Sequence, residues 1–171
     1  MTLSSPPEPI GYVAELGVER TLWTPGASRL ELTLTEDHLN KGGAAHGGIH
    51  MILLDSALGG ALVASLKVEE WCATTQLSTS FLAAAYPGER LVAEGRVVRR
   101  GKHVAHLAGE VKVGERLVAS ATGTWAIWSS RPPSLSKDCR ESSPVRDGRS
   151  ASETSSWRRR QRSEPSKSLR P

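Results

Sequence analysis

Hydrophobic and polar residues alternate strictly in one early stretch of the chain, residues 28–35. Leucine stands at every second position there, with charged or hydroxyl residues between, as expected for a strand with one buried face. Four later runs are rich in β-branched and aromatic residues: 73–84, 90–99, 103–113 and 116–128. Short turn segments join these four runs, which predicts antiparallel hairpins.

A different pattern lies between the first strand and the later ones. Residues 40–48 are polar and rich in glycine, and from there to about residue 67 no proline occurs. Apolar residues of this segment fall on every side of a helical wheel, which predicts a helix, roughly 30 Å long, surrounded by protein. The order of elements therefore predicts an α+β fold, a curled antiparallel sheet wrapped around one long central helix. Residues 1–27 are weakly patterned, with a turn predicted at 24–26.

The composition changes after residue 128. Residues 129–171 include 13 serines and 5 prolines and few apolar residues. Such a segment cannot bury enough apolar surface to offset the entropy lost on ordering. We therefore expect one domain over residues 1–128 and a disordered Ser/Arg-rich tail over residues 129–171.

The formal net charge of +4 is unevenly distributed along the chain. Residues 1–128 hold 11 Lys and Arg against 13 Asp and Glu, whereas residues 129–171 hold 11 against 5. The basic character therefore belongs to the tail, and no nucleic-acid partner is expected for the domain. The cluster of Trp157 and the arginines up to Arg162 could contact nucleic acid or an anionic membrane. The alternative is a solvated tail without a partner, and we favour this alternative.

The two cysteines, Cys72 and Cys139, are far apart in the sequence and form neither a metal-binding nor a disulfide pattern. A reducing compartment is therefore expected. The first ten residues carry three prolines and one glutamate and show no export signal. The apolar segment 49–66 contains His50 and Asp55, and a charge near a bilayer centre costs about 2.5 to 3.5 kcal/mol. We therefore expect a buried helix, no membrane partner and a cytoplasmic location.

Asp55 is the one carboxylate in this apolar helix. Burial disfavours a charged carboxylate unless it is paired, protonated or used in chemistry. The residue alone leaves two interpretations open, a structural carboxylate or a general base. Just before the helix, Gly47 and Gly48 offer backbone N–H groups where a helix N-terminus favours an oxyanion, although such a glycine pair is also a common packing device.

The spacing Asn40-x5-His46-Gly47-Gly48-x6-Asp55, followed by strands, resembles hotdog-fold acyl-CoA thioesterases of the PaaI-like (phenylacetic acid degradation) type. The resemblance extends over residues 18–128. It implies a sheet wrapped around a central helix, with two chains pairing their sheets in a homodimer or a homotetramer. His50 departs from the family pattern, in which an apolar or small residue is more usual.

The resemblance also implies roles for individual residues. The Gly47 N–H would polarise the thioester carbonyl, with Asn40 and His46 shaping that side of the site. Asp55 of the partner chain would activate water or attack directly. Thr74 would help to hold the water.

Three cations surround the turn at residues 99–102: Arg99, Arg100 and Lys102. The resemblance implies that they bind the phosphates of coenzyme A, while the alternative is a charged hairpin tip that favours solubility. His103 and His106 are predicted on opposite faces of one strand, so no metal site is expected.

The resulting hypothesis is hydrolysis of an acyl-coenzyme A to a carboxylic acid and free coenzyme A, without metal or redox cofactor. One rival is an acyl-CoA hydratase or dehydratase of the same fold, and another is a non-catalytic acyl-CoA-binding regulator. The sequence leaves open the acyl group, the choice between dimer and tetramer, and whether Asp55 is a base or a nucleophile.

Overall fold

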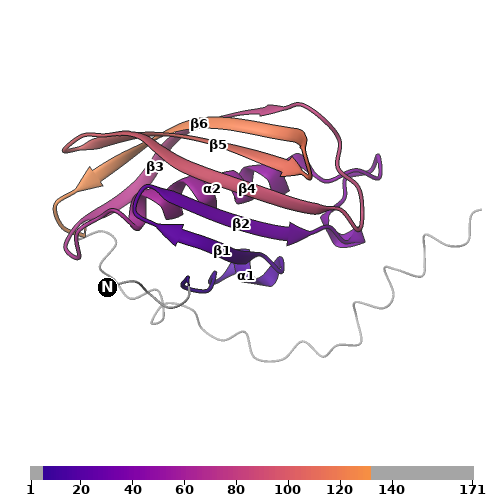
Figure 1. Ribbon diagram of the computed structural model, residues 1–171, viewed down its shortest axis with the longest axis horizontal. Helices are drawn as coiled ribbons and strands as arrows, with labels where there is room; N and C mark the ends of the chain where they lie inside the picture. The colour runs from indigo at the N-terminus through magenta and orange to yellow at the C-terminus, as the bar shows by residue number, and fades with distance from the viewer. Residues whose placement is uncertain (1–5, 132–171) are drawn as a thin grey trace, which may run out of the picture. The chain divides into compact units, whose positions relative to one another are not determined.

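The computed structural model describes residues 6–131, which form a six-stranded antiparallel sheet and a long helix (Figure 1). The helices are α1 (Tyr12–Glu15), the 3-10 helix η1 (Glu36–His38) and α2 (Gly47–Val63). The strands are β1 (Glu19–Thr24), β2 (Ala27–Thr33), β3 (Trp71–Phe81), β4 (Arg90–Arg100), β5 (Val104–Val113) and β6 (Arg116–Trp128). The spatial order is β1-β2-β4-β5-β6-β3, so β1 and β3 are the two edges.

The sheet curls around α2, as the sequence predicts, and the hotdog fold is confirmed (Figure 1). Leucines of α2, among them Leu54 and Leu58, are fully buried against apolar residues of the sheet such as Leu91, Leu107 and Trp125. Burying a leucine side chain stabilises the folded state by about 1.5 to 3 kcal/mol. This contact is the main core of the domain.

The approach of α2 to β4 depends on Gly95. A Cβ at this position would lie 2.5 Å from the carbonyl oxygen of Ala57, inside the van der Waals limit. The glycine thus lets the backbone of α2 pass directly against β4. This contact holds the helix that carries Gly47 and Asp55.

Two predictions about the elements need correction. The predicted helix to about residue 67 ends at Val63, where the Ser65 hydroxyl donates to the Leu62 carbonyl and the chain turns. β1 was not predicted, because it is an edge strand without regular alternation: its register shifts between Arg20 and Leu22. The other strands fall where the hydrophobic pattern places them.

The predicted tail, residues 129–171, lies outside the described residues except for its first three. Within residues 6–131 no helix is long and apolar enough to cross a membrane. The cytoplasmic location stays a prediction.

Candidate functional site

The N-terminus of α2 presents one backbone N–H group without a protein partner. His46 is the N-cap residue, and its Nδ1 accepts a hydrogen bond of 3.0 Å from the Gly48 N–H. Among the described residues, no hydrogen bond uses the Gly47 N–H. Because the first N–H groups of a helix have no intrahelical acceptor, Gly47 can donate to a ligand oxygen. Of the two predicted glycine donors, the structure leaves Gly47 available.

Gly47 lies against an aromatic ring that the sequence did not assign to the site. A Cβ on Gly47 would lie 3.3 Å from the ring of Phe81, the last residue of β3. The Phe81 side chain is 54% exposed, so it covers Gly47 on one side and faces solvent on the other. Its place beside Gly47 follows from the long-range packing of β3 on α2, which no local pattern reveals.

Asn40 shapes the loop before α2. Its Oδ1 accepts a 2.7 Å hydrogen bond from the Gly42 N–H, and its backbone N–H donates to the Ala44 carbonyl. These bonds close the turn that leads to His46 and Gly47. The observed contribution of Asn40 is therefore to the conformation of the loop.

Asp55 and Thr74 are in contact within one chain. The Thr74 hydroxyl donates a 2.8 Å hydrogen bond to Asp55 Oδ1, which joins α2 to the start of β3. The expected full burial of Asp55 is wrong: the carboxylate is half-buried, because the sheet covers α2 on one side only. Met51 and Val63, on the same open side, are 43% and 48% exposed.

A cavity of about 230 Å³ opens at Asp55. Its lining includes Thr74, Trp125 and Arg20 of β1, which is not among the predicted site residues. Burial lowers the pKa of the Arg20 guanidinium, and its Nε has no hydrogen-bond partner in the described part of the chain. Arg20 Nη1 donates to the Pro7 carbonyl at 3.0 Å, which ties the N-terminal segment beside the cavity.

Gly47 and Asp55 do not converge within one chain. They are eight residues apart on the same straight helix, which corresponds to about 12 Å along its axis. Gly47 lies at the Phe81 end of β3, and Asp55 lies at the Thr74 end. One chain therefore carries two separate half-sites.

The three cations of the β4–β5 hairpin divide between two faces of the sheet. Arg100 faces α2, where it donates to the Glu70 carboxylate and the Ser65 carbonyl. The Lys67 backbone N–H and the Arg100 guanidinium hold the pKa of Glu70 below its usual value. Arg99 and Lys102 instead line a separate cavity of about 320 Å³.

His103 and His106 line that same cavity, but only His106 lies in the strand on which both were predicted. The strand alternation does not apply to His103, because β5 begins one residue later at Val104. Within the described ranges no cluster of three or more His, Cys, Asp or Glu side chains is arranged to hold a metal ion.

Cys72 is a free thiol whose pKa is raised by burial, and Cys139 lies outside the described residues.

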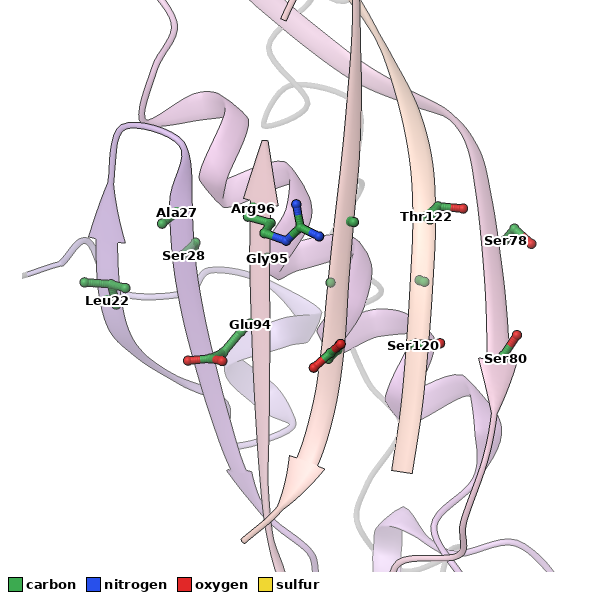
Figure 2. A pocket seen from close by; sticks show the side chains of 14 residues that line it. Leu22, Ala27, Ser28, Ser78, Ser80, Glu94, Gly95, Arg96, Ser120 and Thr122 are labelled. Atoms are coloured by element: carbon green, nitrogen blue, oxygen red, sulfur yellow. The ribbon is translucent and has the colours of Figure 1, made fainter. Parts of the chain in front are cut away.

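The largest of these cavities, about 530 Å³, contains none of the predicted site residues (Figure 2). It lies on the face of the sheet opposite α2, where small hydroxyl residues of β3 and β6 meet Glu94 and Arg96 of β4. The Ser28 hydroxyl, which has no hydrogen-bond partner within residues 6–131, lies on the side of Gly60 and α2. We therefore place the candidate site at the two half-sites on α2.

Sequence and structure comparisons show the family of this chain. Residues 42–120 match the sequence model of the Thioesterase superfamily. The chain is 38% identical over 109 residues to a protein of Deinococcus radiodurans that is provisionally named as an esterase, a match that covers 64% of this chain and 72% of the relative. The chain therefore belongs to the Thioesterase superfamily.

Solved structures point to the same family. A mutant form of the phenylacetic acid degradation protein PaaI of Thermus thermophilus is 26% identical, with a TM-score of 0.63, over 67% of this chain and 96% of that protein. A Streptococcus mutans protein whose structure contains acetyl-CoA is 24% identical, with a TM-score of 0.61, over 67% of this chain and 91% of that protein. The PaaI-like resemblance is thereby confirmed.

Proposed function

We propose that this chain hydrolyses the thioester of an acyl-coenzyme A to a carboxylic acid and free coenzyme A. The free Gly47 N–H would donate to the thioester oxygen as it gains negative charge, which lowers the barrier to attack on the carbonyl carbon. Asp55 would take a proton from the attacking water, held by Thr74, or attack the carbonyl carbon itself. The thiolate of coenzyme A then leaves and takes up a proton, and where Asp55 is the nucleophile, water hydrolyses the resulting acyl–Asp55 anhydride to the free acid. This chemistry requires no metal or redox cofactor.

The observation that carries the proposal is the position of the two half-sites at opposite ends of β3. β3 is an edge strand of 11 residues, and it contains no charged residue and no proline. Edge strands that stay unpaired usually carry such residues, so β3 is suited to pairing with another chain. Antiparallel pairing of β3 with its copy would bring Thr74 and Asp55 of one chain beside Phe81 and Gly47 of the other.

The coenzyme A moiety carries phosphates, and two of the three cations predicted to bind them are not engaged by acidic residues of the described chain. Arg99 and Lys102 form no ion pair with any described residue, whereas Arg100 is engaged by Glu70. We propose Arg99 and Lys102 as phosphate contacts. The acetyl-CoA found with the Streptococcus mutans protein is consistent with this ligand class.

The test is release of free thiol from a panel of aliphatic and aromatic acyl-coenzyme A substrates. Asp55→Asn keeps the size of the side chain and should lower kcat/KM by about 10² to 10⁴, the usual contribution of a general base. Asp37→Asn removes an exposed acid of η1 and serves as the matched control. Equal rates in Asp55→Asn and wild type would refute the role of Asp55, and binding without turnover would support the regulator instead.

A further inference from the structure

One corner of the outer sheet face, opposite α2, gathers exposed apolar side chains. Trp128 ends β6 and pairs across the sheet with Trp71, the first residue of β3. Since Ile127 faces the core, both tryptophans point to the outer face, where they are 39% and 36% exposed. Val104 of β5 and Val98 of β4, 42% and 56% exposed, lie at the same ends of the neighbouring strands.

The same corner is cationic. Arg99 lies beside His106 across β4 and β5, Lys102 is in the following turn, and the Arg131 guanidinium lies 4.8 Å from the centre of the Trp71 ring. None of the six ion pairs of residues 6–131 involves Arg99, Lys102 or Arg131. We call the corner the Trp71 patch; it consists of Trp71, Val98, Val104 and Trp128 with Arg99, Lys102 and Arg131.

We propose that the Trp71 patch binds the surface of an anionic phospholipid bilayer. Tryptophan is enriched where proteins meet the boundary between lipid headgroups and acyl chains, because its ring is apolar and its N–H is polar. Exposed valines can enter the acyl region beside it. The unpaired cations match lipid phosphates and carboxylates in charge, so a bilayer would compete with coenzyme A for Arg99 and Lys102, whereas Arg131 belongs to this patch alone.

The details of the patch favour a bilayer over single-stranded nucleic acid. Nucleic-acid sites of this kind stack bases on open aromatic faces, whereas the Trp71 ring is already covered by Arg131. The two exposed valines have no role in base stacking. The described chain also leaves the sheet here, and the sequence that follows is basic and contains Trp157, a composition suited to an anionic surface.

The experiment compares binding of the full chain to vesicles of phosphatidylcholine alone and of phosphatidylcholine with phosphatidylserine. Wild type should co-sediment with the anionic vesicles, and added salt should weaken the binding because it screens the charges. Trp128→Ser and Arg131→Gln should each lower the partition coefficient, Arg131→Gln by about fivefold, the effect expected for one basic residue near such a surface. Arg131 lies outside the strands, so its replacement leaves the sheet intact.

The matched controls are Tyr12→Ser and Lys41→Gln, which remove an exposed aromatic residue and a cation far from the Trp71 patch in the sequence. Both should bind like wild type. Equal binding to neutral and anionic vesicles, or wild-type binding by both patch variants, would overturn the proposal. Patch variants that lose affinity for a single-stranded oligonucleotide, or that elute as a smaller oligomer, would assign the patch to nucleic acid or to a second copy of the chain.

Discussion

At the scale of single residues, His50 is a titratable side chain buried in an otherwise apolar part of α2. Its side chain is 4% exposed, its ring lies 6.2 Å from that of Phe81, and its Nδ1 has no hydrogen-bond partner in the described chain. Burial lowers the pKa of this imidazole. The nearby positive end of the α2 dipole also disfavours a cation. His50 is therefore held neutral beside the ring that covers Gly47.

This burial predicts a pH-dependent stability. Below the ordinary histidine pKa of about 6.5 the unfolded chain gains a proton that folded His50 resists, so the free energy of unfolding falls as the solution is acidified. The stabilising contribution is complete above that value and is lost as the pH falls toward the lower folded pKa. His50→Phe should flatten the decline between about pH 7 and 5 in urea unfolding.

A control for this measurement is Thr79→Val. The Thr79 hydroxyl is also buried without a partner among the described residues, but it does not titrate. Its replacement should shift the free energy of unfolding by the same amount at every pH. An unchanged slope in His50→Phe would show that other groups cause the acid sensitivity.

At the scale of elements, the contact between α2 and β4 determines where the site residues lie. Gly95 provides the space for the helix backbone at Ala57. Gly95→Ala should therefore separate helix and sheet and destabilise the fold by about 1 to 3 kcal/mol or more, the usual cost of overpacking. The midpoint and slope of urea unfolding measure this change.

Gly59 is the matched control for Gly95. It lies inside α2, and its added Cβ would meet Trp125 at 3.6 Å, an ordinary contact. Gly59→Ala should stabilise the chain by about 0.5 to 1 kcal/mol, because alanine loses less backbone entropy in a helix. Destabilisation of similar size in both variants would contradict the close approach at Gly95.

At the scale of the whole molecule, the proposed site needs two chains, and mixing two inactive variants tests this. Gly47→Pro removes the N–H donor at the first helical position, where proline is tolerated. The extended backbone of His46, with φ −62° and ψ 135°, suits a residue before proline. Gly47→Ala adds a Cβ against Phe81 but keeps the N–H, so it separates the steric effect from loss of the donor.

Mixed and reassembled chains of Asp55→Asn and Gly47→Pro should regain about a quarter of wild-type activity, because half of the random dimers carry one intact site of two. Each variant alone should stay inactive, and Gly47→Ala should keep more activity than Gly47→Pro. No recovery on mixing, despite exchange of chains, would show that Gly47 and Asp55 do not act across an interface.

The sequence by itself determined most of the elements and the family of this chain. Alternation at residues 28–35, the proline-free apolar segment and the His46-Gly47-Gly48 turn are local patterns, and each gave an element or a cap close to the observed one. The spacing to Asp55 also led to the family that the comparisons show. Such patterns are visible in sequence because neighbouring residues share one backbone conformation.

Only the tertiary structure decided which residues meet. β1 became a strand by pairing with β2, Asp55 stayed half-exposed because the sheet covers one side of α2, and Arg100 turned to Glu70 while Arg99 faced outward. The Trp71 patch likewise depends on register between strands far apart in sequence. These outcomes depend on long-range pairing and packing, which leave no periodic signal in any single segment.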